Sequence, residues 1–237
     1  YRQRRLREDR VQDEVHRDTL ARNLMTIDHP ERIKLESGVV RLGLDVSPEA
    51  IDGLLTYMVQ LKEWSGTYNL IAPRERDFLL ARHILDSLSI APWLQPGSLL
   101  DVGTGAGLPG LPLAIIRPEM DVTLLDSAGK KIRFIRHVGR KLKLANIQPL
   151  QQRVEALSAS DGYANITSRA FASLKDFVEA VRSCADESTR LLAMKGAYPD
   201  QELEELPGWI NVESVEKLTV PYLHAERHLV IMSPSEN

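Results

Sequence analysis

The segment that most constrains the fold of this 237-residue chain is glycine-rich and lies at residues 99–110, LLDVGTGAGLPG. Its apolar beginning is typical of a buried strand that leads into Asp101. The glycines that follow at every second position are Gly103, Gly105 and Gly107. Glycine lets the backbone turn tightly and approach a ligand without interference from a Cβ atom. A helix is predicted to begin at Leu108 and Pro109. Proline is tolerated there because the N–H groups of the first helical turn have no partner within the helix.

From residue 98 onward, segments of strand character alternate with segments of helix character. We expect strands at residues 98–102, 121–126, 147–151, 164–169 and 189–195. We expect helices near residues 108–117, 128–144, 173–187 and 200–206. Two later apolar runs, 211–220 and 227–233, are predicted to pair as a closing antiparallel hairpin. This alternation is typical of an α/β protein with a mostly parallel sheet, helices on both faces and a ligand site beyond the carboxyl ends of the strands.

The second predicted strand ends in Asp126, a carboxylate placed to accept hydrogen bonds from ribose hydroxyls. Two kinds of nucleotide cofactor fit this pattern. Gly105, Gly107 and Gly110 satisfy the G-x-G-x-x-G pattern of dinucleotide folds, with the acid about 20 residues further on. The position of Asp101 directly before the glycines favours S-adenosylmethionine, whose amino-acid part Asp101 can help hold, and no hydride-transfer residues are evident. A turn that binds nothing is the plain alternative.

The N-terminal part has a different pattern. Ser47 can cap a helix whose apolar residues recur at helical spacing, and a further helix is expected at about residues 75–91 with Phe78 on a broad apolar face. Residues 1–36 interleave basic and acidic side chains, which predicts a solvated helix or a partly ordered extension. A linker-like stretch is predicted from Pro30, Gly38 and Gly43. The chain is therefore divided into an N-terminal extension (1–45), a helical cap (46–96) and a third domain (97–237).

Charge is distributed unevenly along the chain. The whole sequence has 30 Lys and Arg against 33 Asp and Glu, a net charge of −3, so no chain-wide basic field indicates a nucleic acid. The segment between Ser127 and Val154, however, contains no acid. Its cations are Lys130, Lys131, Arg133, Arg136, Arg140, Lys141, Lys143 and Arg153. Such a segment is either a solvated helix face or a surface that contacts phosphates, and its one-sided charge favours phosphates.

Other features of the composition limit the class of protein. The single cysteine, Cys184, excludes an internal disulfide framework and a cysteine zinc cluster, and is expected to be a buried apolar residue in a reducing cytoplasm. The longest uncharged stretch, residues 102–116, is too short to span a bilayer and is rich in Gly and Pro. We expect a cytoplasmic monomer with no metal ion and no membrane partner.

Several strings in this sequence are more specific than the glycine loop. They are DVGTGAGLPGLPLA (101–114), LLDS (124–127), KKIRFIR (130–136), YNL (68–70), RHILDS (82–87), SRAFAS (168–173), MKG (194–196) and ERHLV (226–230). Together they resemble the ribosomal RNA small subunit methyltransferase G family, also called glucose-inhibited division protein B, over about residues 60–233. Ala106, where many members have proline, is a mild departure, and the first 45 residues have no recognised counterpart.

The resemblance implies a Rossmann-like class I methyltransferase with a seven-stranded sheet and an N-terminal helical cap. It also implies methyl transfer from S-adenosylmethionine to N7 of guanine 527 in 16S rRNA, free or within the 30S subunit. The residues agree with this chemistry. Cys184 is in a predicted helix remote from the strand ends, and Ser168-Arg-Ala-Phe171 replaces the Asn/Asp-Pro-Pro-aromatic turn of many exocyclic-amine methyltransferases. Guanine N7 has a lone pair and no proton to lose, so alignment matters more than a general base.

By this resemblance, Gly103, Leu108, the Val154–Glu155 pair and Arg169 match the family's cofactor contacts. Arg169 is also a candidate to orient the guanine, although a salt-bridged arginine at a strand end is the plain alternative. Lys195 is a candidate contact to phosphate or base, or a solvated lysine. The nearby His83 and Asp86 are expected to form a structural network. The candidate RNA contacts are Lys130, Lys131, Arg133, Arg136, Arg140 and Arg153.

Three functions remain as alternatives. A methyltransferase for a small metabolite is disfavoured by the basic segment. A nicotinamide-dependent oxidoreductase would bind NAD in place of S-adenosylmethionine. A non-catalytic RNA-binding module would bind RNA without transferring a methyl group.

Overall fold

A computed structural model describes residues 29–157, 162–169 and 171–235. In these residues one seven-stranded sheet has the order β3-β2-β1-β4-β5-β7-β6. Its strands are β1 (Leu99–Val102), β2 (Val122–Asp126), β3 (Ile147–Gln151), β4 (Asn165–Ser168), β5 (Arg190–Lys195), β6 (Ile210–Lys217) and β7 (His228–Pro234). The first five in spatial order run parallel, and β7 pairs antiparallel with both β5 and β6. The predicted α/β class, mostly parallel sheet and closing hairpin are confirmed.

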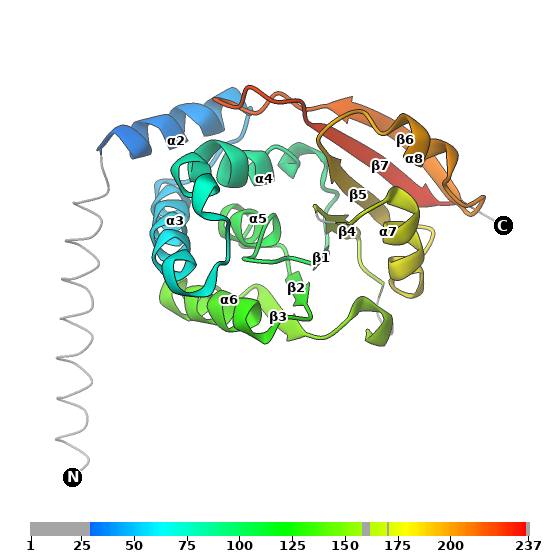
Figure 1. The fold of residues 1–237 in the computed structure, drawn as a ribbon, viewed down its shortest axis with the longest axis horizontal. Coiled ribbons are helices and arrows are strands. Elements are labelled where there is room, and N and C mark those ends of the chain that lie inside the picture. Colours follow the sequence, from blue (N-terminus) through cyan, green and yellow to red (C-terminus); the bar gives the residue numbers. More distant parts are fainter. Residues whose placement is uncertain (1–28, 158–161, 170, 236–237) are drawn as a thin grey trace, which may run out of the picture.

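Helices cover both faces of this sheet (Figure 1). The helices are α2 (His29–Arg41), α3 (Pro48–Tyr68), α4 (Asp86–Leu88), α5 (Gly110–Ile116), α6 (Gly129–Leu142), α7 (Leu174–Val181) and α8 (Asp200–Glu204). Successive residues of a strand face opposite sides, so Leu99 packs in a core with α3, α5 and α6, whereas Leu100 packs in a second core with α7. None of the described helices is long and apolar enough to cross a membrane.

Most elements begin and end within two residues of their predicted bounds. Two ends differ by more. The helix predicted over 173–187 ends at Val181 and is followed by a 3-10 turn, Arg182–Cys184, and the run predicted over 211–220 ends as a strand at Lys217. Cys184 is 1% exposed, as expected for a buried apolar side chain.

The helix α3 follows the predicted local chemistry. The Ser47 hydroxyl accepts a hydrogen bond from the Ala50 N–H at 3.2 Å, and Pro48 occupies the first helical position. Its apolar face is buried in the same core as the strands β1 and β2. The cap therefore shares a core with the sheet, and the division of the chain at residues 46 and 97 stays a prediction.

The prediction of a linker around Pro30 and Gly38 is wrong. Both residues lie in α2, where Pro30 is in the first turn and needs no N–H partner. A Cβ atom on Gly38 would lie 2.6 Å from a methyl group of Leu85, so glycine here allows close packing between α2 and the cap. Gly43, with φ +71°, lies after this helix. The predicted extension at residues 1–28 lies outside the described residues.

The prediction of one helix over residues 75–91 is also wrong. The segment is divided into a 3-10 turn (Pro73–Phe78), a π-helical turn (Leu80–Leu85), α4 and a final 3-10 turn (Ala91–Trp93). Leu79, Ile84, Leu85 and Leu88 are buried, but Phe78 is 48% exposed. The change of helical pitch turns Phe78 away from the core. On the surface, the Arg82 guanidinium lies over the Phe78 ring, 4.3 Å from its centroid.

Candidate active site

The glycine loop lies beyond the carboxyl end of β1, at the centre of the sheet. Gly103 and Gly105 have φ angles of +69° and +61°, which side chains other than glycine rarely adopt. A Cβ atom on Gly103 would have no neighbour within 4 Å, and one on Gly105 would meet only a backbone oxygen at 3.9 Å. The loop therefore presents bare backbone to open space.

Asp101 holds the loop to the start of α5. Its Oδ2 accepts hydrogen bonds from the Thr104 hydroxyl at 2.6 Å and from the Gly110 N–H at 2.8 Å. The side chain is fully buried, and its Oδ1 has no hydrogen-bond partner. Burial raises the pKa of Asp101 from 3.8 to about 6, although the two hydrogen bonds favour the ionised form. This carboxylate organises the loop and keeps one oxygen unpaired.

Asp126 holds the other side of the loop. Its carboxylate, at the end of β2, accepts from the Gly105 N–H at 3.0 Å and from the Ala128 N–H at 2.8 Å. Lys131 forms an ion pair with this carboxylate at 3.1 Å, and its predicted contact with RNA stays a prediction. The Asp126 residue is 6% exposed. The two predicted acids thus lie on either side of the glycine loop.

The cap supports the loop through Tyr57, a residue that sequence reasoning missed. The Tyr57 hydroxyl, on α3, donates to the Ala106 carbonyl at 2.9 Å. The ring is fully buried, and this burial raises the pKa of the phenol. In the sequence Tyr57 is one more apolar position of a helix, with no signal that its hydroxyl reaches the loop.

The remaining predicted cofactor contacts lie near this edge of the sheet. Leu108 is in the loop and is 4% exposed. Val154 and Glu155 form a 3-10 turn just after β3, the strand that pairs with β2. Val154 is buried and Glu155 is exposed. The structure therefore brings the predicted contacts to the carboxyl ends of neighbouring strands, as parallel pairing requires.

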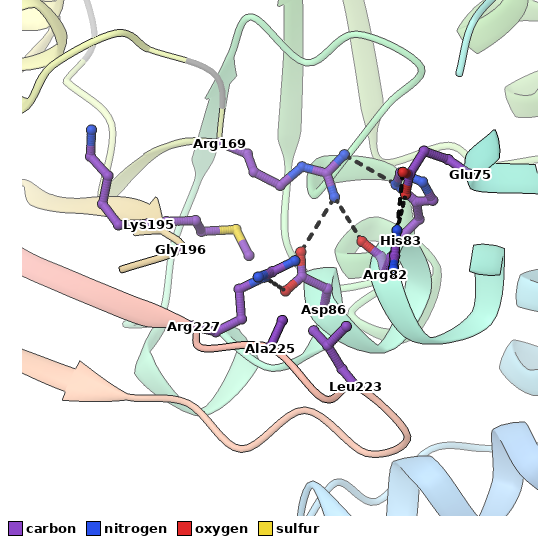
Figure 2. A pocket seen from close by; sticks show the side chains of 11 residues that line it. Glu75, Arg82, His83, Asp86, Arg169, Lys195, Gly196, Leu223, Ala225 and Arg227 are labelled. Carbon is purple, nitrogen blue, oxygen red and sulfur yellow. Dashed lines mark hydrogen bonds and ion pairs between the residues drawn. The ribbon is translucent and has the colours of Figure 1, made fainter. Parts of the chain in front are cut away.

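A cavity of about 510 Å³ lies between the cap, the ends of β4 and β5, and the loop before β7 (Figure 2). Its lining residues are Glu75, Arg82, His83, Asp86, Arg169, Met194, Lys195, Gly196, Leu223, Ala225 and Arg227. Because β4 lies beside β1 in the sheet, the cavity is next to the strand that carries the glycine loop.

A buried carboxylate holds two arginines at this cavity. Asp86 Oδ2 is 3.4 Å from Arg169 Nη1, and Asp86 Oδ1 accepts from Arg227 Nε at 2.8 Å. The Asp86 side chain is 3% exposed, whereas the two arginines are 26% and 24% exposed. Burial raises the pKa of Asp86, and both arginines oppose this rise. The predicted structural network of Asp86 is therefore present, and Arg227 joins it.

His83 borders the same cluster. Its Nδ1 lies 3.4 Å from Arg169 Nη2, and its Nε2 is buried without a hydrogen-bond partner. Burial, reinforced by the charge of Arg169, lowers the pKa of His83 to about 4. The ring is therefore neutral at pH 7.

Lys195 points away from the arginine pair (Figure 2). Its ammonium lies 2.7 Å from Glu202 Oε2, and that oxygen also accepts from the Leu174 N–H at 2.7 Å. The ion pair ties the end of β5 to α7 and α8. A role of Lys195 in positioning substrate stays a prediction.

The basic segment lies largely on α6. Lys130, Arg133, Arg136 and Arg140 are exposed and recur at helical spacing, while Ile132, Ile135 and Val138 are buried on the opposite face. Arg153 is exposed after β3. In the described part of the chain, Lys131 is the one member of the segment with an ion pair. The described residues contain no group of three His, Cys, Asp or Glu side chains that could hold a metal ion.

Comparison with known proteins identifies the family. Residues 50–230 match the model of the family described as rRNA small subunit methyltransferase G. The chain belongs to this family. The Ribosomal RNA small subunit methyltransferase G of Enterobacter sp. (strain 638) is 45% identical over 202 residues, covering 85% of this chain and 98% of that protein. The protein of the same name from Photorhabdus laumondii is 46% identical over 200 residues, covering 84% and 97%.

Solved structures are similar in fold. A SAM dependent methyltransferase from Aquifex aeolicus has a TM-score of 0.51 at 19% identity, covering 71% of this chain and 96% of that one. The DhpI–SAH complex has a TM-score of 0.51 at 17% identity, covering 77% and 95%. At these identities the likeness concerns the fold, which is that of Rossmann-like methyltransferases.

In this member of the rRNA small subunit methyltransferase G family, sequence reasoning missed Tyr57 and Arg227. A signal for Arg227 was present, because it lies within the string ERHLV that resembles the family. Its contact with Asp86 spans 141 residues of sequence, which no local pattern reports.

Proposed function

We propose that this chain transfers the methyl group of S-adenosylmethionine to N7 of guanine 527 in 16S rRNA. The observation that carries the proposal is the arrangement at the carboxyl edge of the sheet. A glycine loop held between Asp101 and Asp126 lies beside a cavity with two arginines. Membership of the rRNA small subunit methyltransferase G family supports the same reaction.

The residues present fit S-adenosylmethionine. The open space beside Gly103 and Gly105 allows a ligand to approach the backbone closely. The unpaired Oδ1 of Asp101 is a buried acceptor beside the loop, and the cofactor's ammonium group is a donor that suits it. The Asp126 carboxylate accepts a hydrogen bond from the Gly105 N–H, and ribose hydroxyls can take the place of this donor. We assign Val154 and Glu155 to contacts with the adenine of the cofactor. We assign Leu108 to the apolar wall of the cofactor site.

Little proton chemistry is required of the protein. When bound, S-adenosylmethionine supplies an electrophilic methyl group, and the lone pair of guanine N7 displaces the thioether without losing a proton. The chain must therefore align the base and shape the field around it. Arg169 and Arg227 present guanidinium donors to the cavity, which suit guanine O6 and the phosphates beside the base. Asp86 keeps these arginines in place, and neutral His83 adds no positive charge beside them.

The substrate is 16S rRNA, either free or within the 30S subunit, and the site of action is therefore the cytoplasm. We assign the exposed cations Lys130, Arg133 and Arg153, close to the cofactor edge, to phosphate contacts. The enzyme acts as a monomer, and the proposal includes no metal ion.

The test is transfer of labelled methyl from S-adenosylmethionine to 30S subunits from cells that lack the modification, with the product mapped by mass spectrometry. We expect a single 7-methylguanosine at position 527. The control is Arg182→Ala, an exposed arginine outside the cavity, which should act like wild type. No incorporation into 30S subunits or free rRNA would refute the proposal. Tight NAD binding without S-adenosylmethionine binding would favour an oxidoreductase instead.

A further inference from the structure

A shallow groove of about 410 Å³ lies between the C-terminal half of α6 and the edge strand β3. Its lining residues are Arg136, Gly139, Arg140, Lys143, Leu144, Ile147 and Pro149. The groove therefore has a rim of three cations, an apolar floor and no acidic lining residue. It shares no lining residue with the arginine cavity beside the glycine loop.

The stability of the fold explains only part of the charge at this groove. Arg136 and Arg140 are four residues apart on one helix face, and like charges at this spacing repel each other. No described carboxylate forms an ion pair with Arg136, Arg140 or Lys143. The helix dipole favours cations near the C-terminus of α6, but it opposes the Lys130 and Lys131 pair at the N-terminus of the same helix. The cationic face of α6 thus runs along the whole helix.

Proline interrupts the free edge of β3 as a partner for an added peptide strand. The Asn146 carbonyl accepts from the Val122 N–H of β2, and neighbouring residues of a strand face opposite directions. The backbone of Pro149, three residues further on, therefore faces the free edge, where it has no N–H to offer. Its carbonyl already accepts from Arg136 Nη2 at 3.3 Å. The cations of this groove therefore offer a partner better contacts than the interrupted strand edge does.

The groove is remote from the predicted point of methyl transfer. Helix α6 begins at Gly129, three residues after Asp126, and its 14 residues span about 20 Å. Arg140 and Lys143 are at the far end, towards the start of the parallel strands. A ligand that reaches both ends of this face must be long and must carry repeated negative charge, which is the chemistry of a phosphodiester backbone.

We propose that the groove between α6 and β3 is a second binding site for the rRNA substrate, which holds its phosphate backbone far from the methylated base. This inference rests on the proposed function. The groove contributes affinity and register and reads no base, because Arg140 and Lys143 contact phosphates alone. Occupation of the groove leaves the chemical step unchanged.

The test compares a double variant, Arg140→Gln with Lys143→Gln, with the wild-type enzyme. Glutamine has a helix propensity close to that of arginine, so α6 should remain folded. Binding to protein-free 16S rRNA should weaken roughly tenfold, and the salt slope of log affinity should become shallower by about 2, one for each phosphate contact. KM for rRNA should rise by a similar factor. The turnover number and the dissociation constant for S-adenosylmethionine should not change.

The matched control is Arg182→Gln, which removes an exposed arginine on the α7 face. Affinity within twofold of wild type for the double variant, or an equal loss for Arg182→Gln, would overturn the proposal. A defect on 30S subunits that is absent on protein-free rRNA would assign the groove to a protein partner and also overturn it. A wild-type enzyme that methylates no rRNA would refute the proposed function itself, which distinguishes the two failures.

Discussion

The buried Asp101 carboxylate should make the stability of this protein depend on pH. Its Oδ2 accepts two hydrogen bonds, and its Oδ1 accepts none. In Asp101→Asn, the amide oxygen can keep both acceptor contacts, and the amide nitrogen takes the place of the unpaired oxygen. The substitution therefore removes the buried charge while it preserves the shape and the main contacts.

The magnitude follows from the pKa of this residue. Burial raises the pKa of Asp101 from 3.8 to about 6, which corresponds to about 3 kcal/mol. The folded state then holds a proton that the unfolded state has released. Stability from this group is fully present below about pH 4 and is lost as the pH rises through about 6. The stability of Asp101→Asn relative to wild type should therefore rise by about 2.5 kcal/mol between pH 4 and pH 7.5, because the carboxyl of the unfolded chain is already partly ionised at pH 4.

Urea unfolding of both proteins at pH 4, 5, 6 and 7.5 measures this difference, because the other titrating groups are the same in both. Asp121→Asn, which changes an exposed aspartate, is the control and should follow wild type at every pH. A difference between Asp101→Asn and wild type that varies by less than 1 kcal/mol across this range would refute the reasoning. The carboxylate would then be ionised at little cost in the folded state.

Four further substitutions test the site. Gly110→Ala places a Cβ atom 2.3 Å from a Leu124 methyl group and should cost about 1–3 kcal/mol in urea unfolding; a loss below 0.5 kcal/mol would show that the contact relaxes freely. Asp126→Ala should raise the dissociation constant for S-adenosylmethionine, and unchanged calorimetric binding would remove Asp126 from the ribose role. Asp86→Asn removes the anion that holds Arg169 and Arg227 at the cavity and should lower rRNA methylation in the labelled-methyl assay; wild-type turnover would show that the two arginines do not depend on Asp86. Arg169→Ala should reduce methyl transfer with the circular dichroism spectrum unchanged, and wild-type turnover would exclude it from the reaction.

Local sequence patterns determined much of this fold. Short apolar runs between segments of helix character predicted the seven described strands, because a strand in a sheet with two covered faces must bury both of its sides. Ser47 and Pro48 predicted the start of α3, since capping depends on a few neighbouring residues. The glycine loop and Asp126 were predicted together, because parallel strands bring their carboxyl ends to one edge.

Local patterns were less successful where one segment depends on another. Gly38 indicated a break, yet it lies within α2 because Leu85 packs closely against it. Phe78 was expected to be buried, but the change of helical pitch exposes it. The ion pair of Lys131 with Asp126 was not expected, and its contact with RNA stays a prediction. Leu85 lies outside the pattern from which the break at Gly38 was inferred, and hydrophobic periodicity does not report a change of helical pitch.

By itself, then, the sequence determined the α/β class, the glycine loop with its two acids, the basic face of α6 and the resemblance to a family. Only the tertiary structure decided which side chains meet in the cavity. Asp86 reaches Arg169 across 83 residues and Arg227 across 141, and Tyr57 reaches the loop across 49. The physical reason is that propensity, capping and periodicity act over a few residues, whereas these contacts form only when the cap packs on the sheet. The same packing buries the titratable groups of the site and so changes their charge states. It keeps the His83 ring neutral, and it leaves the Oδ1 atom of Asp101 buried without a hydrogen-bond partner.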